Sequence, residues 1–274
     1  MSGQTRISFV GGGNMATALI GGLIERGRPP DLIRAVDLSA ESRARLCGRF
    51  GIATGEAPDE AFLATDVLIL AVKPQQMKAA LAPLAGRLDG QLVVSIAAGL
   101  RLEDLSRWLG GYRRLVRAMP NTPALIGAGV TGVFADASVD EAGRATAVAI
   151  LEAVGSVVEV ADEALIDAVT AVSGSGPAYF FHFIEALEAG GRSLGFDEAT
   201  ARKLAIDTAL GAAQLAARSG QSPAILREQV TSKGGTTAAA LASMTESGVF
   251  DAIVRAVQAA CARARELGDE LGRD

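Results

Sequence analysis

The sequence predicts an α/β protein with two domains, a doubly wound sheet followed by an all-helical domain. Three observations predict this. Apolar runs suited to buried strands alternate with helical patterns as far as residue 161, and such alternation is typical of a doubly wound sheet. A glycine-rich turn joins the first of these strands to the first helix. Only helical patterns remain in residues 162–274, so we place the domain boundary before them.

The first 26 residues contain the strand, turn and helix of a dinucleotide-binding motif. Residues 6–16 read Arg-Ile-Ser-Phe-Val-Gly-Gly-Gly-Asn-Met-Ala and fit the pattern G-x-G-x-x-A through Gly11, Gly13 and Ala16. Gly11 permits the tight turn, Gly13 lets the backbone approach a pyrophosphate, and Ala16 is small enough for helix and strand to pack. The free amides and dipole of the helix N-terminus then favour phosphate. We predict a Rossmann-type domain that binds NADPH or NADH through Gly11, Gly12, Gly13, Asn14 and Met15.

The remaining strands and helices follow from apolar periodicity. Strands are predicted at residues 32–36, 66–72, 92–96 and 114–118, with edge strands at 131–134 and 156–160 and a short helix at 40–50. The run at 66–72 is apolar enough for a strand that is buried on both faces. Helices of the second domain are predicted at residues 164–172, 177–194, 197–219, 237–247 and 250–271.

Composition excludes several classes of protein. No apolar run approaches the roughly 18 residues of a membrane span, and the N-terminus does not read as a signal peptide. A net charge of −5 without a basic cluster argues against a nucleic-acid partner. Cys47 and Cys261 are interpreted as reduced thiols in or near the core, and with the single histidine His182 they cannot build a zinc site of familiar spacing. We therefore expect a cytoplasmic protein without a metal.

Further cofactor contacts are expected at the carboxyl ends of the strands, where open parallel sheets bind ligands. Asp37 ends the second strand, where an acid can bind the adenine ribose and repel a 2′-phosphate. The alternative is that Asp37 only opens a turn. Arg43 lies one helical turn further on, so it could still bind that phosphate. Ala97 and Ala98 leave room for a flat ring, or form an ordinary strand-to-helix turn. The last candidate segment comprises Ala71, Val72, Lys73 and Pro74. Its backbone is favoured over the Lys73 side chain as the group that contacts the cofactor.

Two segments of the helical domain contain residues that packing does not require. Residues 172–179 hold two glycines and Pro177, which capping of the following helix explains. Residues 231–237 form a Gly-Gly turn before a helix, and consecutive backbone amides there can bind a carboxylate or phosphate. Thr237 belongs to that site or is only an N-cap. The helix around His182 is apolar over so much of its surface that we expect burial against a second subunit.

Together these segments resemble pyrroline-5-carboxylate reductase. The matching motifs run in the family's order over essentially the whole chain. They are Phe-Val-Gly-Gly-Gly-Asn-Met-Ala (9–16), Ala-Val-Lys-Pro (71–74), Val-Ser-Ile-Ala-Ala-Gly (94–99), Arg-Ala-Met-Pro-Asn-Thr-Pro-Ala (117–124), Asp-Ala-Val-Thr-Ala-Val-Ser-Gly-Ser-Gly-Pro-Ala-Tyr (167–179) and Gly-Gly-Thr-Thr (234–237).

The resemblance implies the last step of proline biosynthesis, in which hydride from NAD(P)H reduces 1-pyrroline-5-carboxylate to L-proline. It implies a helical dimerisation domain, at least a homodimer, and an active site between the two domains at the dimer interface. It implies that the substrate carboxylate is held by Ser232, Gly234, Gly235, Thr236 and Thr237, with Thr237 close to the ring nitrogen. Glu163 falls at a substrate-side acid, and Asn121 and Gln229 at cofactor-side positions. Similar proteins usually have proline where this chain has Lys233, so the conformation of this loop does not transfer.

The residues that the chain lacks also favour an imine substrate. Reduction of a ketone needs a proton donor for the developing alkoxide, and related hydroxyacid dehydrogenases use a lysine on the long helix. Residues 177–194 contain no lysine. A cyclic imine can arrive protonated, so the enzyme needs mainly orientation, a carboxylate anchor and a dry site. The alternatives are another imine or 2-hydroxyacid oxidoreductase of this fold, and a nonenzymatic dinucleotide-binding protein that would not need Gly-Gly-Thr-Thr.

Overall fold

The chain forms two compact units. The computed structural model describes residues 5–273. One unit contains the described residues up to Ser175 together with those from Ala260 on, and the other runs from Gly176 to Ala259. This division by contacts falls later than residue 162, because α7 (Leu165–Val169) packs on strands of the first unit. A π-helical turn, Thr170–Gly174, follows α7 directly.

The first unit is built on one sheet, whose order in the described chain is β3-β2-β1-β4-β5-β6-β7-β8. Its strands are β1 (Ile7–Val10), β2 (Ile33–Val36), β3 (Ala53–Gly55), β4 (Val67–Leu70), β5 (Leu92–Ser95), β6 (Leu115–Met119), β7 (Gly129–Ala135) and β8 (Gly155–Glu159). All neighbouring pairs are parallel except β6 with β7. The chain order reverses at β1, so the carboxyl ends of β1, β2 and β4 meet at a topological switch point, where doubly wound sheets bind ligands.

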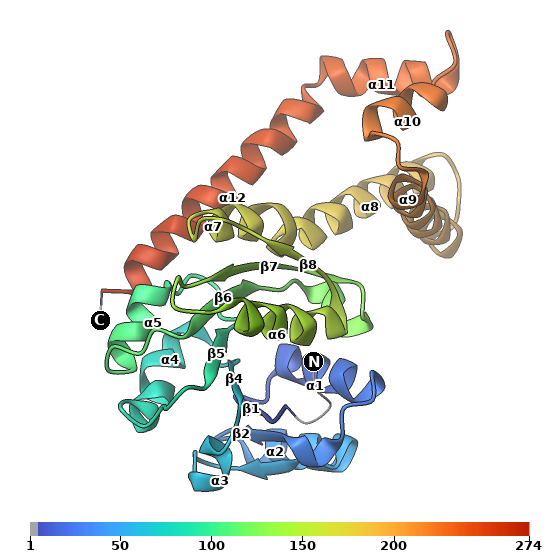
Figure 1. Cartoon of the computed structure of the whole chain (residues 1–274). Coiled ribbons are helices and arrows are strands. Elements are labelled where there is room, and N and C mark those ends of the chain that lie inside the picture. The colour runs from blue at the N-terminus through green and yellow to red at the C-terminus, as the bar shows by residue number, and fades with distance from the viewer. Residues whose placement is uncertain (1–4, 274) are drawn as a thin grey trace. The chain divides into compact units, whose positions relative to one another are not determined.

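Helices cover both faces of this sheet, and each face has its own apolar core (Figure 1). Alternate residues of a strand point to opposite faces, so Phe9 belongs to one core and Val10 to the other. The first core is completed by α1 (Asn14–Glu25), α2 (Ala40–Phe50) and α6 (Glu141–Leu151). The second is completed by α3 (Glu60–Leu63), α4 (Pro74–Leu81) and α5 (Leu102–Trp108).

One strand differs from its predicted position. Residues 131–134 were expected at an edge, and this expectation is wrong: β7 lies between β6, to which it is antiparallel, and β8. The edges of the described sheet are β3 and β8. The sequence analysis gave no range for α4, α5 and α6, and it also missed β3, α3 and α10 (Pro223–Gln229). The last three, with three, four and seven residues, are too short to show a period.

The second unit is helical and leaves much apolar surface exposed. It contains α8 (Gly176–Ser193), α9 (Glu198–Ser219), α10, α11 (Thr236–Glu246) and the start of α12 (Val249–Leu271). Helices α8 and α9 pack closely at Gly191, where an added Cβ would lie 3.2 Å from that of Ala201. Exposed apolar side chains include Phe180, Phe181, Leu204, Leu210 and Phe250. The His182 side chain, 87% exposed and 3.5 Å from Glu185, lies on the same helix as the first two.

The C-terminal part of α12 belongs to the first unit and packs beside the turn that follows β5. Gly99, with φ +74°, lies so close to α12 that an added Cβ would be 3.1 Å from Leu271 and 3.5 Å from Leu267. Arg101 and Asp269 form an ion pair of 2.5 Å across the same contact. The end of the chain therefore holds the turn between β5 and α5, although the two segments are far apart in the sequence.

Two smaller findings concern the surface. Cys47 is exposed, so its expected place in or near the core is wrong: the apolar stripe of α2 buries Leu46 instead. Cys261 is partly buried. No helix in the described part of the chain combines the length and apolarity needed to cross a membrane.

Candidate active site

The three glycines of the turn after β1 differ in their surroundings. Gly11 has φ +101°, and an added Cβ would lie 2.8 Å from the Ala71 carbonyl oxygen at the end of β4. At Gly12 the added Cβ would meet Leu46 at 2.8 Å. Gly13 has the ordinary dihedral angles φ −67° and ψ −174°, and no described atom lies within 4 Å of an added Cβ. The backbone therefore requires glycine at Gly11, a side chain at Gly12 would displace the Leu46 methyl group, and Gly13 borders open space.

The helix that follows this turn begins with free donors. Gly13 is the N-cap of α1 and provides no side-chain hydrogen bond, so the N–H groups of Asn14 and Met15 stay available. Among residues 5–273, five other helices have a Ser or Asp N-cap that accepts such a bond: Ser39, Asp59, Asp140, Asp197 and Ser222. An uncapped helix N-terminus beside open space fits the pyrophosphate of a dinucleotide.

Asp37, at the end of β2, faces this turn. One carboxylate oxygen accepts the Gly12 N–H at 2.7 Å, and the other accepts the Ser39 N–H at 2.8 Å. Asp37 therefore does open a turn, and its charge also lies at the switch point. Arg43 donates to the carbonyls of residues 37 and 38, at 2.7 and 2.9 Å. Arg45, which the sequence did not single out, donates to the Gly12 carbonyl at 2.7 Å.

We expect Asp37→Ser to shift the ratio of the specificity constants for NADPH and NADH towards NADPH. The carboxylate repels a 2′-phosphate by an energy on the order of 1–3 kcal/mol. Steady-state kinetics with both nucleotides measures the ratio. Asp37→Asn, which removes the charge and keeps an amide oxygen as acceptor, should shift it in the same direction. An unchanged ratio in both variants would mean that the side chain does not face the ribose.

The other strand ends differ in how open they are. Lys73 is the exposed N-cap residue of α4, and Pro74 occupies the first helical position. Ala71 and Val72 are half-buried; the Ala71 carbonyl closes over Gly11. Ala97 is buried and Ala98 exposed, so of these two small residues only Ala98 presents its side chain to solvent.

Asn121, expected at the cofactor, and Glu163, expected at the substrate, both make hydrogen bonds within the first unit. Asn121 is 9% exposed; its amide donates to the Ser173 carbonyl at 3.0 Å and accepts the Val130 N–H at 2.9 Å. Glu163 Oε1 accepts the Leu102 N–H at 2.8 Å and lies 3.2 Å from Arg117 Nη1. Sequence reasoning missed Arg117, although a cation inside the apolar run 114–118 was a usable signal.

In the second unit the candidate residues lie on the loop before α11. Gly234 has φ +72°, and the Gly235 N–H donates to the Ser232 carbonyl at 3.0 Å, so residues 232–235 form a tight turn. Gly235 is the N-cap of α11 and offers no side chain, hence Thr237 is not the N-cap. The N–H groups of residues 236–238 precede the first intrahelical bond and remain free to bind an anion. Gln229 is exposed at the end of α10.

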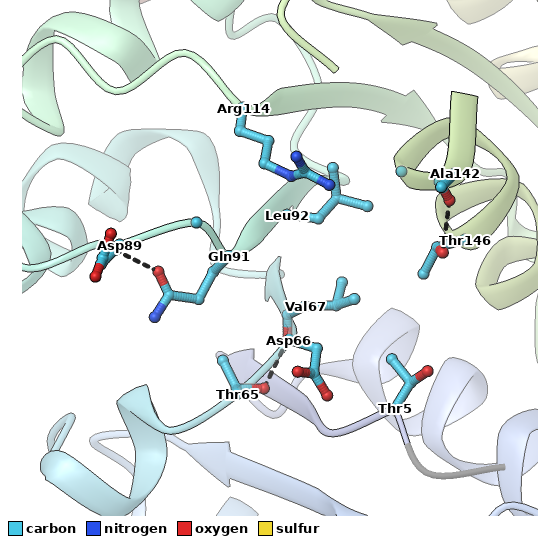
Figure 2. A pocket seen from close by; sticks show the side chains of 12 residues that line it. Thr5, Thr65, Asp66, Val67, Asp89, Gln91, Leu92, Arg114, Ala142 and Thr146 are labelled. Atoms are coloured by element: carbon cyan, nitrogen blue, oxygen red, sulfur yellow. Dashed lines mark hydrogen bonds between the residues drawn. The ribbon is translucent and has the colours of Figure 1, made fainter. Parts of the chain in front are cut away.

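A pocket of about 390 Å³ opens at the amino ends of strands β1, β4 and β5, opposite the carboxyl ends that meet at the switch point (Figure 2). Several of its polar groups are bonded within the protein: the Gln91 amide oxygen accepts the Asp89 N–H, its nitrogen donates to the Leu63 carbonyl, and Thr65 Oγ1 donates to backbone carbonyls. Arg114 Nε is buried without a partner among the described residues. Arg114 pairs with Asp140 at 3.2 Å. None of the residues that the sequence predicts at the ligand lines this pocket, and it lies at the amino ends of the strands, whereas doubly wound sheets bind ligands at the carboxyl ends.

Comparison with known proteins finds a matching protein family for the N-terminal part of the chain and another for the helical part. Residues 163–267 match the family described as pyrroline-5-carboxylate reductase dimerisation, and residues 6–99 match the family described as NADP oxidoreductase coenzyme F420-dependent. The pyrroline-5-carboxylate reductase of Pseudomonas aeruginosa is 50% identical over 270 residues, 98% of each chain.

Solved structures agree. A pyrroline-5-carboxylate reductase from Coxiella burnetii superposes with a TM-score of 0.92 at 39% identity, covering 96% of this chain and 98% of that one. The Plasmodium falciparum pyrroline carboxylate reductase, crystallised with NADP bound, gives 0.84 at 27% identity with the same coverage.

The fold and the glycine turn define a Rossmann-type oxidoreductase that uses NAD(P)H. Its helical part is a dimerisation domain, so the protein is a homo-oligomer, which accounts for the apolar surface of α8 and α9. The identity along nearly the whole chain then specifies the enzyme: the chain belongs to the pyrroline-5-carboxylate reductase family.

Proposed function

We propose that the chain reduces 1-pyrroline-5-carboxylate to L-proline, and that its own residues act by binding and orienting rather than by donating a proton. The reaction transfers a hydride to the C=N carbon of the ring, and bound NAD(P)H supplies that hydride. A protonated imine accepts it and becomes a neutral amine, so no alkoxide needs a general acid. This agrees with a long helix, α8, that carries no lysine.

The observation that carries the proposal is the uncapped start of α11. A free N-terminus with three available N–H groups binds a carboxylate, and the substrate has one. We assign the substrate carboxylate to Ser232, Gly234, Gly235, Thr236 and Thr237, and the ring nitrogen to the Thr237 hydroxyl. Thr237 is the residue we assign to catalysis, because its hydroxyl would orient the reacting C=N bond.

The cofactor contacts are proposed for the switch point of the first unit. The pyrophosphate is assigned to residues 11–15 and the adenine ribose to Asp37. Residues 71–74 and the pair Ala97 and Ala98 are assigned to the remainder of the dinucleotide, with Gln229 as a further contact. Asn121 is omitted, because its amide already joins Val130 and Ser173 and thereby holds the turn after β6. Glu163 is omitted from the substrate contacts for the same kind of reason.

Two coarser assignments accompany this function. We assign residues 1–161 to the dinucleotide-binding domain and 162–274 to the substrate-binding and dimerisation domain, in agreement with a dimerisation match that begins at residue 163. We place the enzyme in the cytoplasm, where NAD(P)H is available.

We expect the purified protein to oxidise NAD(P)H with 1-pyrroline-5-carboxylate and to form L-proline. A panel of 2-keto acids should give at most a small fraction of that rate, because α8 carries no lysine that could donate a proton to an alkoxide. Nucleotide absorbance and chromatography of the product measure the two quantities. Preference for a keto acid would assign the site to a hydroxyacid oxidoreductase, and nucleotide binding without turnover of any substrate would indicate a nonenzymatic protein.

A further inference from the structure

We propose that Glu163 is a positioning residue that, together with Arg117 and Asp167, holds the start of α5 and so the turn of residues 96–101 against the cofactor. Glu163 then acts on nucleotide binding and does not touch the substrate. The inference rests on the proposed assignment of Ala97 and Ala98 to the cofactor, and all of the residues in it lie in the first unit.

The three side chains form a charge cluster in which Arg117 and Asp167 are buried and Glu163 is 25% exposed. Arg117, on β6, is 3% exposed and donates to Asp167 Oδ1 at 2.9 Å and to Glu163 Oε1 at 3.2 Å. Asp167, on α7, is 6% exposed. Arg117 Nε finds no partner in the described part of the chain, so the guanidinium depends on these two carboxylates. Removing one partner of a buried ion cluster is costly, because the remaining charge is poorly solvated.

Glu163 extends this cluster to the backbone of α5. That helix starts at Leu102, and its N-cap residue, Arg101, makes no side-chain capping bond. The Leu102 N–H is instead accepted by Glu163 Oε1 at 2.8 Å. A carboxylate at a helix N-terminus satisfies a free donor and interacts favourably with the helix dipole. Glu163 therefore caps α5 from a distant part of the sequence.

The turn before α5 is held from its other side by α12. Gly99 packs against Leu267 and Leu271, and Arg101 pairs with Asp269. The Asp269 carboxylate, with a smaller contribution from Asp167, raises the pKa of Arg101. Residues 97–101 thus lie between two anchors, of which Glu163 is the one connected to β6. Loss of that anchor should loosen the turn while β5 and α12 remain in place.

Two substitutions at Glu163 separate positioning from substrate contact. Glu163→Gln keeps an oxygen that accepts the Leu102 N–H, and Glu163→Ala removes it. The control is Glu103→Ala, which deletes an exposed negative charge one residue beyond Leu102 without removing that bond. Calorimetry gives the Kd of NAD(P)H, and kinetics at saturating nucleotide give kcat and the KM for the imine substrate. Exchange of the Leu102 amide reports the capping bond, and thermal unfolding reports stability.

We expect Glu163→Ala to raise the Kd of NAD(P)H about tenfold, as for loss of a charge-assisted hydrogen bond, and to expose the Leu102 amide to exchange. Its kcat and substrate KM should stay within about threefold. Glu163→Gln and the control should bind nucleotide within about threefold of the parent.

Other outcomes would overturn the inference. A rise in substrate KM or a fall in kcat in both Glu163 variants, with unchanged nucleotide affinity, would make Glu163 a substrate-side acid. A lower unfolding temperature with unchanged Kd would make it purely structural. The proposed function fails separately, if the unmodified chain binds nucleotide and does not reduce 1-pyrroline-5-carboxylate.

Discussion

Replacing Gly13 by valine is expected to weaken NAD(P)H binding at least about a hundredfold, beyond detection by calorimetry at ordinary concentrations. Gly13 has dihedral angles that valine can adopt, and no described atom lies within 4 Å of an added Cβ. The protein itself can therefore accept the substitution. The added isopropyl group would fill the space over the first N–H groups of α1, where the pyrophosphate must come close. Binding is lost because the ligand is excluded, not because the fold is damaged.

The control for this prediction is Gly48→Val on α2, another glycine with open space around its Cβ position. It should leave nucleotide affinity unchanged. Both variants should unfold near the temperature of the parent protein, and the helical content by circular dichroism should not change. Unaltered affinity in Gly13→Val would show that the pyrophosphate does not lie over the start of α1.

The second large effect is expected at Thr237, where replacement by alanine should lower kcat/KM for the imine substrate roughly ten- to a hundredfold. A hydrogen bond to a charged group contributes about 1.5–3 kcal/mol, which corresponds to that range. The substitution keeps the backbone amide and so the carboxylate site. Since Gly235 and not Thr237 is the N-cap of α11, little helix stability should be lost. The affinity for NAD(P)H should barely change, because the pyrophosphate is assigned to the other unit.

Thr237→Val tests whether the hydroxyl is responsible, because valine has nearly the same shape. It should behave like alanine if the hydroxyl orients the ring nitrogen, whereas a packing role would leave it active. Thr245→Val, which removes a hydroxyl bonded to the Leu241 carbonyl on the same helix, is the matched control and should be fully active. Full activity of both Thr237 variants would remove Thr237 from the site.

Local signals in the sequence were sufficient for the strand, turn and helix of the opening motif. The run from Ile7 to Val10, the three glycines and the apolar stripe of α1 are contiguous, so neighbouring residues alone predict their conformation. The bounds of α2 agree with the prediction at both ends, because Ser39 caps it and Gly51 ends it with φ +68°. Motifs of this kind also carried the family resemblance and hence the reaction.

Sequence patterns do not predict hydrogen bonds between residues that lie far apart in the chain. Glu163 was expected beside the substrate, and a single acid in a motif gives no sign that its oxygen accepts the Leu102 N–H 61 positions away. Asn121 is similar, since its amide joins the turn after β6 to backbone groups at Val130 and Ser173. Hydrogen-bond partners of this kind depend on which elements pack together, and periodicity does not encode that.

The sequence by itself determined the doubly wound sheet, the helical second part, the glycine turn and the family, because each depends on short contiguous patterns. Only the tertiary structure decided that β7 runs inside the sheet and antiparallel to β6, that Cys47 is exposed, and that the end of α12 packs on the turn at Gly99. It also decided that Gly13 borders open space while Gly11 and Gly12 are packed. These features depend on distances between segments far apart in the chain, which burial of the apolar cores sets only when the whole unit folds.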